Sequence, residues 1–270
     1  MLSLIRRPTA AYFLLAFFIS WIGAFLLVAP RLAHGETIQK FTGLMMFPFM
    51  LLGPSISGIF LTWRFDGGSG LRNFFSRLSP RRIQPRLLAA LFIPPVLILS
   101  ILFVLSKTAS PAYAPNHFFP GAGFGAVAGF LEELGWTGFV FPRMIAGRKS
   151  WLPSAVLLGV LWGCWHAPVI DYLGAATPHG SAWLPFFLAF IASITAIRVL
   201  ICWLYTRTQS ILLAQLMHAF STASLVVFSP GSISPFQEAL WYALYAAGLW
   251  FLIGLLFATK LLSSTETQRE

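Results

Sequence analysis

GAGFGAVAGFLEELGWTGFVF, residues 121–141, is an apolar run that carries two adjacent charges near its middle, Glu132 and Glu133. A helix needs roughly 20 predominantly apolar residues to cross a bilayer, so this run predicts a membrane span. An ionisable group at the centre of a span costs at least about 2.5–3.5 kcal/mol and by default marks a functional site. A buried ion pair that only joins helices is the structural alternative.

The composition of the whole chain agrees with a fold in lipid. Of its 270 residues, 57% are hydrophobic and 10% are charged, and the mean hydropathy is +0.78, whereas soluble domains have about 25% charged residues. The two cysteines, Cys164 and Cys202, lie in apolar runs without the spacing of a metal knuckle or a disulfide framework. We therefore expect one integral membrane domain over residues 1–270, all-α and built as a polytopic helical bundle.

The apolar runs predict about eight transmembrane helices. The predicted spans are Ala10–Ala29, Phe41–Trp63, Leu87–Ser106, Gly121–Phe141, Pro153–Leu173, Leu184–Thr206, Ser210–Phe228 and Ala239–Leu262. The basic segment Met1–Arg7 resembles the start of a signal peptide, but a secretory apolar region has only about 7–15 residues. The first run is longer, so we expect a retained first helix.

The net charge of +10 comes from arginines and lysines in the connections between spans. One side of the predicted topology carries 14 of them, namely Arg6, Arg7, Arg64, Arg72, Arg77, Arg81, Arg82, Arg86, Arg143, Arg148, Lys149, Arg207, Lys260 and Arg269. The other side carries 3, namely Arg31, Lys40 and Lys107, while Arg198 falls inside the sixth span. The positive-inside rule then places both termini in the cytoplasm. The Arg64–Arg86 loop suits anionic lipid better than a specific anionic partner, and nothing suggests nucleic acid.

Two histidines complete a candidate site with the acidic pair. His166 lies in the fifth predicted span and His218 in the seventh, at depths comparable to that of Glu132. One such histidine alone is as easily a satisfied core residue. Two of them beside carboxylates form a group able to bind a metal ion or to move protons.

Helical spacing separates the two carboxylates. At about 100° per residue, Glu132 and Glu133 cannot face the same way, whereas Glu133 and Thr137 are neighbours one turn apart. We therefore expect the two glutamates to have different roles. The same run also has small residues every four positions, at Gly121, Gly125 and Gly129. Such a face lets another helix approach closely.

These residues resemble the motifs of the CPBP intramembrane proteases, which include CAAX prenyl endopeptidases and bacterial bacteriocin-processing and immunity-type relatives. The family pattern is E-E-x-x-x-R, F-x-x-x-H and H-x-x-x-N, on successive helices. This chain reads EELGWT at 132–137, WGCWH at 162–166 and HAFST at 218–222. The resemblance covers about two-fifths of the chain, and the protease-like core is expected at about 121–228.

Three positions depart from the family pattern. Thr137 replaces the arginine, Trp162 the phenylalanine and Thr222 the asparagine. Without a cation one turn away, Glu133 is expected to use a hydroxyl, a backbone group or a proton instead. A threonine can still donate one hydrogen bond, although it lacks the reach of an amide.

The resemblance implies an intramembrane endopeptidase that hydrolyses a membrane-associated protein or peptide. Its implied catalytic residues are Glu132, Glu133, His166, His218 and Thr222. In a metal-free version, Glu132 and His166 hold and deprotonate water, while His218 and Thr222 steady the oxyanion. In a metal version, Glu132, His166 and His218 bind zinc.

Two other classes of protein fit the same residues. One is a transporter that uses the Glu/His cluster as a proton or ion site, and the other is an immunity-type factor that binds partners without catalysis. For a protease, we expect an integral protein of the bacterial plasma membrane.

Overall fold

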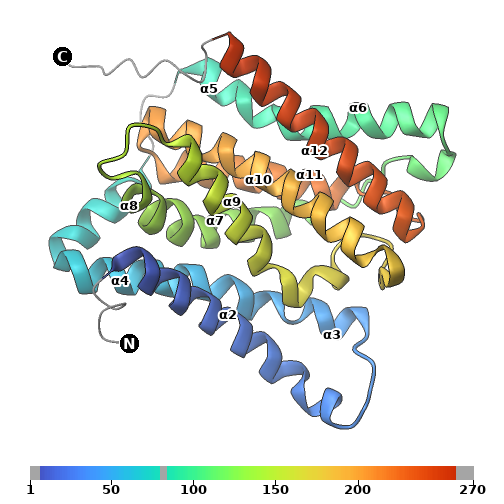
Figure 1. Ribbon diagram of the computed structural model, residues 1–270, viewed down its shortest axis with the longest axis horizontal. Coiled ribbons are helices and arrows are strands. Elements are labelled where there is room, and N and C mark those ends of the chain that lie inside the picture. Colours follow the sequence, from blue (N-terminus) through green and yellow to red (C-terminus); the bar gives the residue numbers. More distant parts are fainter. Residues whose placement is uncertain (1–6, 80–83, 260–270) are drawn as a thin grey trace.

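The computed structural model describes residues 7–79 and 84–259, and within them the chain is helical without a strand. The long helices run alongside one another in a bundle, as Figure 1 shows. The predicted all-α, polytopic fold is confirmed. Several residues used in the sequence analysis lie outside the described part, namely Met1 to Arg6, Arg81, Arg82, residues 260–262 of the last predicted span, and Arg269.

The helical elements follow one another along the chain with short connections. In chain order they are α2 Pro8–Ala33, α3 Lys40–Leu44, α4 Phe47–Ser76, α5 Pro85–Ala89, η1 Ala90–Phe92, α6 Ile93–Thr108, η2 Pro111–Tyr113, α7 Gly121–Gly135, η3 Trp136–Val140, α8 Phe141–Ile145, α9 Leu152–Trp165, η4 Ala167–Tyr172, η5 Gly180–Ala182, α10 Trp183–Thr208, α11 Ile211–Phe228 and α12 Pro235–Ala258. Of the η elements, η3 is a π-helix and the others are 3₁₀-helices.

Six segments of the described chain are long and apolar enough to cross a membrane. They are Pro8–Ala33, Lys40–Ser76, Pro85–Thr108, Gly180–Thr208, Ile211–Phe228 and Pro235–Ala258. These segments match the first, second, third, sixth, seventh and eighth predicted spans in order, and the protein is an integral membrane protein.

The fourth and fifth predicted spans are each divided in the structure. The fourth passes from α7 through the π-helix η3 into α8. The fifth predicted span continues to Leu173, but α9 ends at Trp165, and His166 is its C-cap residue. The reason is Pro168, which has no N–H for the helix ladder and whose ring would meet the carbonyl four residues back. His166 therefore lies at a helix end inside the bundle.

Helix α7 packs most extensively against α11 and also against α4. Its glycine face meets the backbone of α11 directly. A Cβ placed on Gly129 would lie 2.6 Å from both the amide nitrogen of Ala219 and the carbonyl oxygen of Gln215. The small residues thus bring the acidic helix and a histidine helix into close contact, as the sequence predicted.

Gly129→Ala is expected to destabilise the protein, because overpacking against an immovable backbone costs about 1–3 kcal/mol. Gly123→Ala is the matched control, since a Cβ at this position of the same helix meets nothing within 4 Å. Thermal unfolding of the purified variants in one detergent measures both effects. Equal melting temperatures for Gly129→Ala and Gly123→Ala would show that the close contact is not important for stability.

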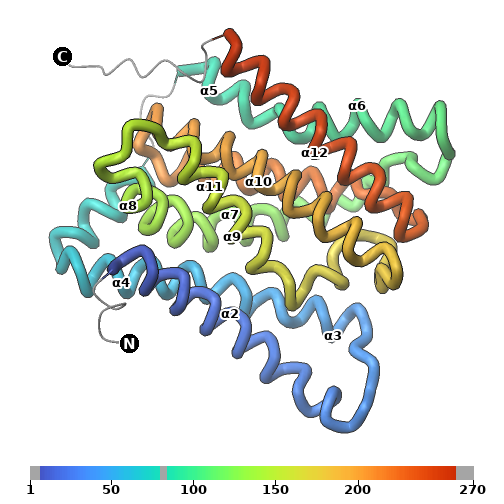
Figure 2. Tube along the Cα trace, in the orientation of Figure 1, coloured from blue at the N-terminus to red at the C-terminus, as the bar shows by residue number. Residues whose placement is uncertain are grey.

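The connections alternate between the two ends of the bundle, as the trace in Figure 2 shows. The start of α2, the end of α4, α8 and the end of α10 lie at one end, on the left of Figure 1. The end of α2, α3, the start of α7 and the start of α12 lie at the other end, on the right. The left end is called the basic end below, because the elements there carry many arginines: Arg64 and Arg72 in the second half of α4, Arg143 in α8, Arg148 after α8 and Arg207 at the end of α10.

Candidate functional site

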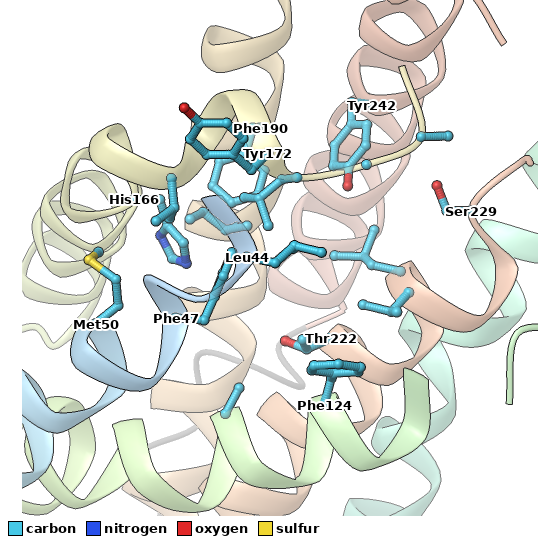
Figure 3. Close-up of a pocket in the computed structure, with 18 of the residues that line it drawn as sticks. Leu44, Phe47, Met50, Phe124, His166, Tyr172, Phe190, Thr222, Ser229 and Tyr242 are labelled. Atoms are coloured by element: carbon cyan, nitrogen blue, oxygen red, sulfur yellow. The ribbon is translucent and has the colours of Figure 1, made fainter. Parts of the chain in front are cut away.

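The two adjacent glutamates of α7 point in different directions. Glu132 lines a cavity of about 540 Å³, together with His166, His218 and Thr222. Glu133 is fully buried, and it does not line that cavity. The structure therefore brings four of the five predicted catalytic residues to one cavity and places the fifth directly behind it. Figure 3 shows His166 and Thr222 beside this cavity, with Phe124 and Tyr242 on its wall.

Two indole N–H groups hold one oxygen of Glu132. Trp162 Nε1 donates to Glu132 Oε2 over 2.7 Å, and Trp136 Nε1 donates to the same oxygen over 3.2 Å. Among the described residues no protein group is hydrogen-bonded to Oε1. One carboxylate oxygen is thus fixed by protein while the other remains available to a molecule in the cavity.

Glu133 lies at the centre of a buried polar network. The hydroxyl of Thr137 donates to Oε2, and so does Arg198 NH1, over 2.7 Å. His218 Nδ1 donates to Oε1 over 2.8 Å. Glu133 thus has the hydroxyl partner that the sequence suggested, and it also has a cation that the sequence analysis did not expect. Its cation, Arg198, comes from α10 instead of α7, and its side chain is fully buried.

Both histidines are oriented by a hydrogen bond at Nδ1. His166 Nδ1 lies 2.8 Å from the carbonyl oxygen of Trp162, an acceptor, so this nitrogen carries the proton. His218 is held in the same way by Glu133, and each ring then presents Nε2 away from its partner. The indole of Trp162 contacts both rings, with centroid separations of 5.6 Å to His166 and 4.9 Å to His218.

Trp162 joins the parts of the site to one another. Its N–H holds Glu132, its ring faces both histidines, and Arg198 Cζ lies 4.1 Å from the ring centroid. A phenylalanine, the usual family residue, has no N–H to donate. The substitution that seemed conservative in the sequence therefore adds a hydrogen bond to the carboxylate that lines the cavity.

The π-helix η3 directly follows the glutamates and is tied down by two arginines. A π-helix breaks the regular i→i+4 ladder, and such turns are frequent at functional sites. Arg77 NH2 donates to the carbonyl of Gly138 over 3.0 Å, and Arg143 NH1 donates to that of Phe139 over 3.0 Å. Arg143 is in turn paired with Asp66 of α4. Arg77, from the predicted Arg64–Arg86 loop, and Arg143 thus hold the turn that follows the two glutamates.

A zinc ion would find two suitable nitrogens here but no third ligand in place. The orienting bonds at Nδ1 leave both Nε2 atoms free, as is common for histidines that bind metal. However, within the described ranges no group of three or more His, Cys, Asp or Glu side chains is placed to hold a metal ion. The side chains do not fit a His₂Glu site as they stand, and no step below is routed through a metal.

Two residues of the site, Arg198 and Trp136, were not among the candidates found from the sequence. Arg198 was counted only as a charge within a span, although an arginine at membrane depth needs a buried partner. That rule, applied to Arg198, would have pointed to the acidic pair. Trp136 is one turn from Glu132, so its contact could have been found from spacing alone.

Comparison with known proteins agrees with the motifs. The model of the family "Type II CAAX prenyl endopeptidase Rce1-like" matches residues 114–224. No curated protein matches the chain. The matched residues include all three motif segments and the lining residues Glu132, His166, His218 and Thr222. The resemblance to the CPBP and CAAX proteases is thereby confirmed for this part of the chain, and it supports a peptide hydrolase in general.

Proposed function

We propose that this chain, whose core resembles the CAAX endopeptidase family, is an intramembrane endopeptidase that hydrolyses a membrane-associated protein or peptide with a glutamate-activated water. The observation that carries this proposal is the environment of Glu132. One of its oxygens is fixed by two tryptophans, and the other faces a cavity that also contains two oriented histidines. A general base needs this combination of fixed position and access to water.

The proposed reaction begins with a water held between Glu132 Oε1 and His166 Nε2. Glu132 takes a proton from this water while the oxygen of the water attacks the carbonyl carbon of the peptide. The C–N bond then breaks, and Glu132 returns the proton to the leaving amine. General acid–base catalysis of this kind contributes about 10²–10⁴-fold to a rate. The products are a carboxylic acid and an amine, which become a carboxylate and an ammonium group once the second proton moves from acid to amine, so atoms and charge balance without a metal.

The developing oxyanion needs hydrogen-bond donors on the other side of the cavity. We assign this role to His218 and Thr222, both of which line the cavity. Glu133 accepts the Nδ1–H of His218 and thereby fixes the orientation of the ring; in the proposed step the ring carries both protons and donates to the oxyanion from Nε2. Arg198 balances the charge of Glu133, so that the carboxylate stays ionised and the ring stays oriented.

The direct test is hydrolysis by the purified protein in proteoliposomes. Apolar peptides are incubated in water enriched in heavy oxygen, and products are identified by mass spectrometry. We expect new termini and one heavy oxygen in the new carboxylate. A transporter or a binding factor with the same residues would give no cleaved product, which would refute the proposal.

Hydrolysis is also expected to persist in the presence of a zinc chelator, because the proposed mechanism uses only protein groups. The measurement compares turnover before and after chelation, together with metal analysis of the purified protein. A zinc peptidase treated in parallel is the control. Loss of turnover on chelation and its recovery on adding zinc would favour the His₂Glu alternative and contradict the metal-free mechanism.

We also propose that the basic end of the bundle faces the cytoplasm, with both chain termini on that side of a bacterial plasma membrane. The support is the concentration of arginine in the elements at that end. This orientation is the starting point of the inference below.

A further inference from the structure

The mouth of the cavity is built from the short helix α3 and from connections at a single end of the bundle. Lining residues come from the α2–α3 side at Lys40, from the segment before α7 at Asn116, from the η4–η5 connection at Gly174, and from the α11–α12 connection at Gly231. The elements next to them, α3, the start of α7 and the start of α12, lie at the end opposite the basic end (Figure 1). Among the described residues, none that lines the cavity belongs to a connection at the basic end.

The site is closed toward the basic end. Thr137 and Arg198, which lie behind Glu133, are fully buried. Further along the chain, Phe139 in η3 and Phe141 in α8 are also fully buried, and Tyr205 is only 1% exposed. Water and substrate therefore do not approach Glu132 from the arginine-rich side.

The lining of the cavity also limits the kind of chain that fits there. Its walls are largely aromatic and aliphatic, including Phe47, Phe124, Leu225 and Tyr242. Within the described part of the lining, Lys40 is the one lysine or arginine, and its Nζ already donates to the carbonyl of Gly174 over 2.9 Å. Burying a charged peptide side chain against such walls would be unfavourable. The cavity suits an apolar, uncharged segment.

We propose that the active site opens to the non-cytoplasmic side of the membrane and takes apolar segments of exported or membrane-inserted proteins that emerge there. The proposal rests on the proposed protease function for its substrate class, and on the charge asymmetry for its direction. The consequence is that proteins confined to the cytoplasm are not substrates, because their chains cannot reach the mouth.

The direction of the mouth can be tested without any activity. Single cysteines are introduced at Asn116 in the mouth, at His34 on the same end outside the cavity, and at Ser69 at the basic end. All three positions are exposed. The parent is Cys164→Ala, which keeps only the fully buried Cys202. A membrane-impermeant maleimide is applied to intact cells and to opened membranes.

We expect Asn116→Cys and His34→Cys to react in intact cells as fully as in opened membranes, and Ser69→Cys to react only after opening. The parent protein, Cys164→Ala, gives the background labelling in the absence of an exposed cysteine. Labelling of Ser69→Cys in intact cells, with Asn116→Cys protected, would invert the orientation and overturn the inference. The proposed protease function would be unaffected by that result.

The substrate class is tested with two single-span reporters that carry the same apolar segment just outside or just inside the membrane. Cleavage of the outer reporter alone, absent in a Glu132→Gln strain, is the expected result. Cleavage of the inner reporter alone would overturn the inference and leave the protease function intact. If the wild type cleaves neither these reporters nor the peptides in proteoliposomes, the protease function fails, whatever face the labelling reports.

Discussion

Glu132→Gln is expected to lower peptide hydrolysis by about 10²–10⁴-fold, the contribution of a general base, without changing the melting temperature. Glutamine has nearly the same shape, and its carbonyl oxygen can still accept both indole N–H bonds that hold Oε2. The fold therefore keeps its contacts, while the group that takes the proton from water is lost. Turnover of the peptide in proteoliposomes is compared at matched protein amounts.

The neighbouring substitution, Glu133→Gln, is the matched control for this experiment. It removes the charge that balances the buried Arg198, so the protein itself should become less stable. Glu132→Gln should therefore lower the rate of hydrolysis at an unchanged melting temperature, whereas Glu133→Gln should lower the melting temperature. Wild-type turnover in Glu132→Gln would invert the roles of the two glutamates, or exclude a glutamate-dependent protease if Glu133→Gln is equally active.

Arg198→Ala is expected to cost about 3–5 kcal/mol of stability, because it leaves the carboxylate of Glu133 buried without its cation. Restoring the family arginine within α7 should return much of that loss. Arg198 NH1 lies 3.5 Å from the hydroxyl of Thr137, so an arginine at position 137 can place its guanidinium in the space that alanine vacates. The double variant Thr137→Arg/Arg198→Ala should therefore be more stable than Arg198→Ala, and it should regain hydrolysis.

The single variant Thr137→Arg is the control for moving the guanidinium from position 198 to position 137. It puts a second guanidinium into a fully buried site that already holds one, so it should destabilise the protein. Arg198→Lys keeps the charge but loses the flat group above Trp162, and should lie between wild type and alanine. If the double variant is no more stable than Arg198→Ala, an arginine at position 137 cannot replace the cation that Arg198 supplies to Glu133.

Much of the fold was accessible from the sequence because each span is a local property. Length and hydropathy are enough to place α10 or α11 within a few residues. The end of α9 was missed because the apolar run continues past Pro168, and the effect of that proline on the backbone was not considered. The π-helix was missed because no amino-acid composition or spacing pattern distinguishes it from an α-helix. One of the bonds that hold it comes from Arg77, 61 residues before Gly138, and such a contact cannot be found from local spacing.

The candidate site was predictable in its residues but not in all of its contacts. Glu132, His166 and His218 could be found as ionisable groups at membrane depth. The pairing of Glu133 with Arg198 depends on how α7 faces α10, 65 residues further along the chain. Spacing rules describe neighbours on one helix and say nothing about such pairs. The tertiary arrangement therefore supplied the cation that the motif lacked.

The π-helix between the glutamates and α8 also restricts how the length of this segment can change over evolution. A π-turn is equivalent to an α-helix with one residue inserted. Loss of one residue from Trp136–Val140 could leave a regular helix, but α8 would turn by about 100° relative to α7. Arg143 would then swing away from Asp66, its partner on α4. Sequences that lack this residue should therefore also have lost, or moved, the acidic partner at position 66.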